Sequence, residues 1–201
     1  MDFFFSHGEL NTLRSALRPR IEEHKKRSNI VPADSYIYVI IEGLLYLCTE
    51  NELYERSILR FMRPGEIFTA NQSLDIYNGI SYIVTKTNSK TAVFSKHELE
   101  LFLSDRPLWQ ERFNEVFYTG LQERALMTNY ILHRRTIRGR LLCFLRDEAA
   151  IQQTDKIHIP MPYSDLADYL AAERTAMMKE IGKMKKDGII SGEKRVLSLL
   201  V

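Results

Sequence analysis

The sequence predicts an α+β protein in which a β-roll, a double-stranded β-helix, is followed by a long helix and a small C-terminal domain. Three observations predict this order. Short β-branched and aromatic runs dominate residues 1–105, an apolar stripe with helical spacing starts at Pro107, and two brief helical patterns followed by two strand patterns close the chain. The expected parts are a β-roll over 1–105, a long helix and hinge over 106–135, and a small C-terminal domain over 136–201.

The composition is that of a globular protein. Hydrophobic residues make up 45% and charged residues 27% of the 201 residues, which excludes a disordered or fibrous chain. No apolar run reaches the about 18 residues that a membrane span needs, and no export signal precedes the first strands. Cys48 and Cys143 lie far apart in the sequence, without a disulfide framework. We therefore expect a cytoplasmic protein that does not bind membranes.

The charges are distributed unevenly along the chain. Residues 1–105 carry a net charge of −2, whereas 106–135 and 136–201 each carry +2. The N-terminal part is thus acidic and the C-terminal part mildly basic, which weakly indicates an anionic partner for the C-terminal part.

The first part consists of short strands with turns between them. A short helix is expected over residues 9–18, and Ser95 is a plausible N-cap for another helix. Arg63-Pro64-Gly65-Glu66 is a turn that reverses the chain. The strand patterns cover residues 36–41, 44–47, 57–62, 67–68, 81–84 and 91–94.

A long helix is predicted from Pro107. Apolar side chains recur at spacings of three and four from Trp109 to Ile131, over about seven turns. Such a stripe is longer than a small barrel can cover, so we expect it to pack against the same helix of a second chain. Packing on its own barrel is the alternative.

A hinge and a second helix are expected after the long helix. Residues 134–140 are polar and basic and contain a glycine, which suits a connection between domains. The second helix is expected from Leu141, and Pro160 and Pro162 hold residues 157–162 in an extended conformation.

Residues 163–201 carry the most specific pattern. Leu166, Ala167 and Leu170 form the apolar face of a short helix, and a tight break precedes a second helix over residues 174–186. Gly188 can end that helix because glycine adopts the left-handed conformation easily. Strand patterns over 189–191 and 196–199 flank a basic tip. Two helices with a tight turn and a hairpin form a winged helix-turn-helix.

One face of the second helix is basic. Met177, Ile181 and Met184 fall on the buried side, and the opposite side carries mainly lysines. In a DNA reader this opposite face enters the major groove, where Arg or Lys binds guanine O6 and N7, and further lysines contact phosphates. A solvated helix face is the alternative. The predicted DNA-binding residues are Arg174, Thr175, Lys179, Lys183, Lys186, Lys194 and Arg195.

On these residues the chain resembles the CRP–FNR superfamily of bacterial transcription regulators over nearly its whole length. Residues 165–170, Glu173-Arg174-Thr175 and residues 179–190 carry the resemblance most specifically. The resemblance implies a homodimer that binds an inverted repeat in double-stranded DNA, with base contacts from Arg174 and Lys179. It also implies RNA polymerase as a partner.

The chain departs from the family pattern at three positions near the second helix. Thr175 stands where many relatives have an acidic residue that reads cytosine, so the target sequence should differ. Ala171 stands where the turn usually has glycine. Glu173 stands where relatives often have a phosphate-binding serine, so its carboxylate would weaken binding locally.

The roll departs further from its cyclic-AMP-binding relatives. Those relatives use a glutamate for the ribose and an Arg-Ser pair for the phosphate, and Ala70, Gly79 and Ile80 stand at these positions here. A buried phosphate without a cationic partner is costly, so we expect no binding of cyclic AMP. Two cysteines are too few for an iron–sulfur cluster. The candidates for another effector are Glu66, Asn71, Gln72, Tyr82, Arg124 and Thr128, with a polar position on a dimer seam as the alternative for Arg124.

No catalytic or metal site is evident in the sequence. The five histidines are isolated, without metal-ligand spacing, and no phosphate loop or nucleophile elbow is present. We therefore expect neither an enzyme nor a cofactor. The alternative function is a ligand-binding β-roll protein whose winged helix contacts another protein instead of DNA.

Overall fold

The computed structural model describes residues 4–50, 56–70, 80–119, 122 and 129–200. The chain divides into two compact units, Met1–Arg124 and Ala125–Val201. The boundaries expected after residues 105 and 135 stay predictions. In the part of the chain that the structure describes, no helix has the length and hydropathy to cross a bilayer.

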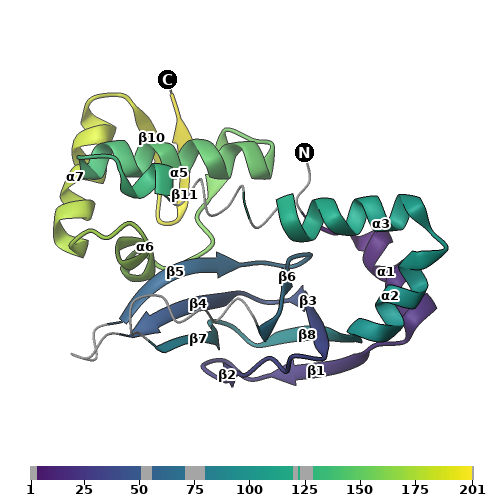
Figure 1. The fold of residues 1–201 in the computed structure, drawn as a ribbon. Helices are drawn as coiled ribbons and strands as arrows, with labels where there is room; N and C mark the ends of the chain where they lie inside the picture. Colours follow the sequence, from purple (N-terminus) through teal and green to yellow (C-terminus); the bar gives the residue numbers. More distant parts are fainter. Residues whose placement is uncertain (1–3, 51–55, 71–79, 120–121, 123–128, 201) are drawn as a thin grey trace. The chain divides into compact units, whose positions relative to one another are not determined.

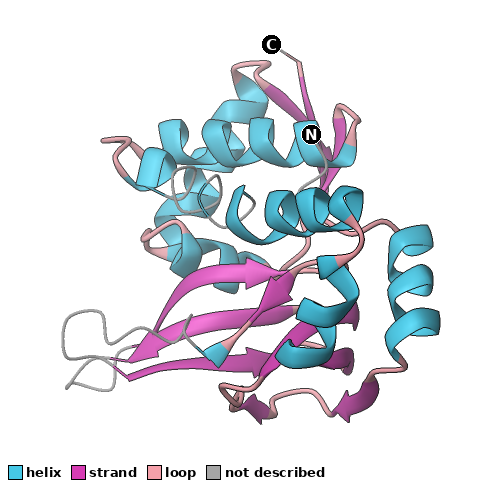
Figure 2. Cartoon of the chain, turned by 45° about the vertical axis from the view of Figure 1, so that its right-hand side comes forward, coloured by secondary structure: helices cyan, strands magenta, loops and turns pink. Residues whose placement is uncertain are grey.

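Unit 1 contains two four-stranded antiparallel sheets, with strand orders β1-β8-β3-β6 and β2-β7-β4-β5 (Figure 1). Figure 2 shows these strands in magenta. The arrangement confirms the predicted β-roll and adds β1 and β2, whose polar residues gave no strand pattern. The strands are β1 (Arg20–His24), β2 (Asn29–Ile30), β3 (Tyr36–Glu42), β4 (Leu45–Glu50), β5 (Arg56–Met62), β6 (Ile67–Phe68), β7 (Ile80–Thr85) and β8 (Ser89–Ser95).

The core of the roll lies between the two sheets. Tyr38 of β3 stacks on Phe68 of β6 with ring centroids 5.0 Å apart. Leu45, Met62 and Ile83 of the second sheet belong to the same buried cluster. Side chains that alternate along the strands therefore join the sheets into one roll.

The predicted turn before β6 depends on a glycine and a buried carboxylate. Gly65 has φ +89°, and a Cβ there would lie 2.6 Å from the carbonyl oxygen of Phe5, so only glycine fits. Glu66 is 2% exposed. It accepts hydrogen bonds from the Arg63 backbone N–H at 3.0 Å and from Arg60 Nη2 at 2.5 Å. Glu66 thus closes the turn and balances the Arg60 charge.

The helices in the described part of unit 1 are α1 (His7–Leu17), α2 (Lys96–Ser104), α3 (Pro107–Asn114) and the π-helix η2 (Glu115–Thr119). Ser95 caps α2 as predicted, because its side chain accepts from the Glu98 N–H. The helices cover the first sheet with apolar side chains, among them Leu13, Leu99 and Phe113.

The predicted long helix is only partly described. Its first turns are α3, and at Glu115 the helix widens to π geometry, which the spacing of the apolar residues did not indicate. Gly120, Leu121 and Met127 of the expected stripe lie outside the described residues. Residues 129–132 are again helical, in unit 2.

Unit 2 confirms the predicted helix-turn-helix and its hairpin. Its longest described helix begins at Ile137 instead of Leu141, because the Thr136 hydroxyl caps it by accepting the Gly139 N–H at 3.1 Å. The three strands form an antiparallel sheet of order β10-β11-β9. The elements are α5 (Ile137–Gln152), β9 (Lys156–His158), α6 (Tyr163–Tyr169), α7 (Arg174–Lys186), β10 (Ile190–Glu193) and β11 (Val196–Leu199).

The core of unit 2 is built from all its helices and its sheet. Phe144 of α5 meets Tyr169 of α6 edge to face, with ring centroids 6.0 Å apart. Gln152 at the end of α5 bonds both the N–H and the C=O of His158 at 2.8 Å, so it pairs with β9 as a neighbouring strand would. The apolar side chains of this core include Leu141, Leu145, Ile157, Leu166, Leu170, Met177, Ile181, Met184 and Leu197.

The turn between α6 and α7 contains an alanine in the left-handed conformation. Ala171 has φ +48°, which costs an L-residue about 1–2 kcal/mol, whereas Ala172 has an ordinary negative φ. We expect Ala171→Gly to stabilise unit 2 by about 1 kcal/mol after the larger unfolded-state entropy of glycine is included. For a domain of this size that corresponds to a rise in Tm of about 4–8 °C.

Calorimetry of the full chain checks this, with Ala172→Gly as the matched control. The control should lower Tm, because it adds backbone entropy to the unfolded state without relieving strain. A lower Tm for Ala171→Gly as well would contradict the assignment of strain to this turn.

Candidate nucleic-acid interface

The N-terminus of α7 is capped by a glutamate. Glu173 Oε1 accepts the Thr175 N–H at 2.7 Å and Oε2 accepts the Ala176 N–H at 2.6 Å. These hydrogen bonds, first of all that from the Thr175 N–H, lower the pKa of Glu173. The departure noted at Glu173 therefore has a local structural role, which is to start the helix.

One face of α7 is anchored in the core of unit 2. Met177 and Met184 are 0% exposed and Ile181 is 4% exposed. This confirms the predicted buried side. Because successive residues turn by about 100°, burial of these three side chains fixes the rotation of the helix about its axis.

An arginine on α5 ties α7 down along its length. Arg138 Nε bonds Glu180 Oε1 at 2.5 Å and its Nη2 bonds Asp187 Oδ2 at 2.8 Å. The hydrogen bond to Glu180, and then that to Asp187, raises the pKa of Arg138. One guanidinium thus bridges the middle and the end of α7.

A second arginine on α5 holds the turn that orients α7. Arg140 Nη1 bonds the carbonyl oxygens of Leu170 at 2.9 Å and Ala171 at 2.7 Å, while its Nε bonds the Arg134 carbonyl at 3.0 Å. A cation at these carbonyls also complements the C-terminal end of the α6 dipole. The sequence gave no signal for either arginine bridge.

The C-terminus of α7 ends as predicted. Gly188 has φ +69°. The Ile189 N–H bonds the Met184 carbonyl at 2.9 Å, a Schellman-type closure that sends the chain directly into β10.

All seven predicted DNA-binding residues are exposed. Five lie on α7, and Lys194 and Arg195 form the turn between β10 and β11. Lys183 Nζ lies 3.9 Å from Glu180 Oε2. Within the described residues, the side chains of Arg174, Lys179 and Lys186 make no hydrogen bond or ion pair, so their charges face solvent.

The hairpin is fixed to the helices beside it. Tyr163 of α6 donates its hydroxyl to the Lys194 carbonyl at 2.5 Å, and Lys185 Nζ bonds the Gly192 carbonyl at 2.6 Å. Burial raises the pKa of Tyr163. A Cβ at Gly192 would lie 2.2 Å from the Val196 carbonyl oxygen, so the hairpin requires glycine there. Lys185 therefore points towards the hairpin, unlike its lysine neighbours.

The predicted effector residues are only partly placed. Glu66 is buried and engaged by Arg60. Tyr82 is half-buried opposite Cys48 in the pairing of β7 with β4, and burial raises its pKa. The other four, Asn71, Gln72, Arg124 and Thr128, lie outside the described residues.

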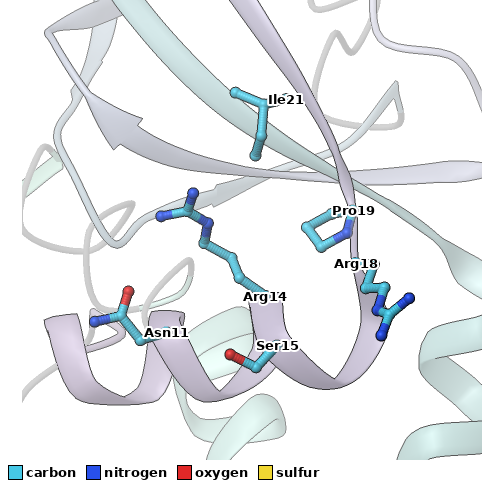
Figure 3. A pocket seen from close by; sticks show the side chains of 6 residues that line it. All are labelled: Asn11, Arg14, Ser15, Arg18, Pro19 and Ile21. Atoms are coloured by element: carbon cyan, nitrogen blue, oxygen red, sulfur yellow. The ribbon is translucent and has the colours of Figure 1, made fainter.

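The hollows in the described part of unit 1 include two that neither Glu66 nor Tyr82 lines. One, of about 720 Å³, lies between α2, α3 and η2 and has an apolar floor that includes Leu99, Phe113 and Phe117. The other, of about 470 Å³, runs along α1 (Figure 3). Figure 3 shows the guanidinium groups of Arg14 and Arg18 pointing to different sides of the helix, so they do not converge on one ligand.

Among the described residues no three His, Cys, Asp or Glu side chains gather in a way that could hold a metal ion. Cys48 is buried and Cys143 half-buried, and neither forms a disulfide.

Comparison with known proteins identifies the C-terminal domain. Residues 139–200 match the family model of the Crp-like helix-turn-helix domain. A search of the curated proteins finds no match.

Solved structures share the fold across the whole chain. A cyclic nucleotide-binding domain containing protein from Listeria monocytogenes has a TM-score of 0.79 at 14% identity, covering 94% of this chain and 96% of its own. A CooA mutant from Carboxydothermus hydrogenoformans has a TM-score of 0.76 at 16% identity, covering 98% and 93%. FixK2 from Bradyrhizobium japonicum has a TM-score of 0.69 at 17% identity, covering 90% and 92%.

The cap at Glu173 predicts a pH-dependent stability. The pKa of Glu173 is lower in the folded state than the ordinary value of 4.5. The ionised carboxylate therefore stabilises the fold fully above pH 4.5, and this stabilisation is lost as the pH falls through the pKa of the folded state. We expect Glu173→Gln to lower Tm by a few degrees at pH 7, with the difference from the parent shrinking below pH 4.5.

Thermal unfolding between pH 3 and 8 checks this, with Glu193→Gln at the exposed hairpin as the control. The control should have the same Tm as the parent at every pH. If the Tm of Glu173→Gln stays below that of the parent by the same amount down to pH 3, the ionised cap is not the cause.

Proposed function

We propose that this chain, which carries a Crp-like helix-turn-helix domain on the fold of the CRP–FNR transcription regulators, is a homodimer that binds an inverted repeat in DNA. One observation carries the proposal: the cationic side of α7 is exposed while the opposite side is buried. The match of residues 139–200 to a Crp-like helix-turn-helix domain supports a transcription regulator and not an enzyme.

The exposed side chains divide into two roles. Arg174 and Lys179 lie towards the N-terminal half of α7, the part of a recognition helix that reaches base edges. Either can donate to guanine O6 and N7. Positive charge continues on both sides of these two residues, where the phosphates would lie. It is carried by Lys183, Lys186 and the hairpin residues Lys194 and Arg195. The hairpin is a wing in this proposal.

The described part of the predicted stripe, including Phe113 and Val116, packs on the roll itself, as in the alternative interpretation. Support for the dimer comes instead from two other apolar residues of α3 and η2. Leu108 is 81% and Tyr118 60% exposed in unit 1, and exposed large apolar side chains on one helical segment favour a protein partner. A two-fold dimer presents two α7 helices to successive major grooves about 34–36 Å apart, which requires an inverted repeat.

We also propose that the roll does not bind cyclic AMP. Ala70 supplies no carboxylate for a ribose, and the carboxylate of Glu66 already bonds Arg60 and the turn. The resemblance further supports a cytoplasmic protein that meets RNA polymerase on DNA.

Selection of bound duplexes from a random library tests the proposed function. The full chain should recover an inverted repeat with half-site centres about 10 base pairs apart. Recovery of no repeat, or binding that is indifferent to salt, would favour a domain that contacts protein instead.

The two roles predict different responses to substitution. Lys183→Ala should weaken binding to all duplexes and reduce the slope of log K against log salt by about 0.9 per subunit, the value for one phosphate. Lys179→Ala should cost about 1–3 kcal/mol on the selected site and relax the preference at one base pair.

Salt-titrated binding to the selected site and to a scrambled duplex measures both effects. Arg146→Ala is the control, because it removes one exposed positive charge from α5 and none from α7. A slope change for Arg146→Ala as large as for Lys183→Ala would mean that net charge, not the α7 face, governs binding.

A further inference from the structure

A methionine stands exposed on the cationic side of α7. Met178 is 39% exposed, whereas Met177 and Met184 of the same helix are 0% exposed. Its side chain therefore does not contribute to the core as theirs do. It is a large apolar group at the edge of the face that carries Lys179 and Lys186, since it lies about 100° around the helix from Met177.

The residues beside Met178 leave room for a close partner. Gly182, one turn further along, has no atom within 4 Å of the position where a Cβ would lie. Glycine inside a helix is unfavourable by about 1 kcal/mol relative to alanine, and its usual advantage is close approach of a ligand to the backbone. A flat surface thus adjoins the methionine on its C-terminal side.

Thr175 extends the apolar surface on the N-terminal side. It lies three residues before Met178, and long side chains in helices lean towards the N-terminus, which brings Met178 over that turn. The Thr175 backbone N–H bonds Glu173 Oε1 at 2.7 Å. The exposed Thr175 side chain carries a methyl group that a partner can contact.

We propose that Met178, together with the Thr175 methyl, contacts the 5-methyl group of a thymine in each half-site. This inference rests on the proposed function. The thymine methyl is the one apolar group on the major-groove edge of the base pairs. The adjacent Lys179 and Arg174 attract the phosphates and bind acceptors, so they bring the helix to the groove. The apolar patch between them then distinguishes thymine from cytosine at a neighbouring base pair.

Deoxyuridine substitution in the selected duplex tests this, because it removes the methyl and leaves base pairing unchanged. Each thymine of one half-site is replaced in turn, and affinity is measured for the parent chain. We expect roughly a three- to tenfold loss at one position, the effect of uncovering one or two apolar carbons, and little change elsewhere.

Three variants assign the effect to the side chain. Met178→Ala should bind the thymine and deoxyuridine duplexes equally at that position, and Met178→Leu should retain most of the discrimination. Lys183→Ala should bind both duplexes more weakly but keep the ratio of the two affinities. Because Met178 and Lys183 are exposed, the Tm of every variant should be close to that of the parent. Tm is measured for each variant as a check on folding.

The outcomes separate the two proposals. If no duplex is selected, the proposed function fails and this inference with it. If a site is selected but no thymine responds to deoxyuridine, or Met178→Ala keeps the parent's ratio, the site reads DNA and the role given to Met178 is wrong.

Discussion

The rotation of α7 about its axis is the constraint on which the interface depends. A helix of a small domain buries one stripe, and here Met177, Ile181 and Met184 are that stripe. Burying a side chain of this kind contributes about 1.5–3 kcal/mol, so three of them outweigh any alternative rotation that exposed lysines could favour. The residues that remain outside are then determined by the helical repeat alone.

Polar contacts set the ends of α7. They fix the orientation of the helix more than they add to the stability of the fold. Glu173 closes the first turn, Arg138 bridges to the middle and the end, and Arg140 holds the preceding turn by its carbonyl oxygens. Exposed ion pairs contribute little to stability. Their bond geometry nevertheless fixes where the helix begins relative to α5, so the cationic side keeps one orientation relative to the wing. A reader of base edges needs this fixed orientation, since a misplaced side chain loses its paired hydrogen bonds.

The sequence could predict the features that depend on periodic apolar residues and the turns that require glycine. Periodic apolar residues predicted the buried side of α7, and Gly188 predicted its end. The polar strand β1 was missed because its residues do not alternate apolar with polar, and the π-helix η2 has no signal in residue spacing. The bridges of Arg138 and Arg140 join residues far apart in the sequence, so no local pattern reveals them. The cap at Glu173 was interpreted through its charge alone, whereas the folded chain uses its two oxygens as hydrogen-bond acceptors.

The central claim is that the Lys179-bearing side of α7 lies against base edges in the major groove. Replacement of guanine by 7-deazaguanine in the selected duplex tests it directly, because this removes the N7 acceptor and leaves pairing and phosphates unchanged. The parent chain should lose about tenfold or more in affinity at one guanine per half-site, the value of one good base contact, and Lys179→Ala should show no such loss there. Equal affinity of the parent for both duplexes at every guanine would contradict the claim.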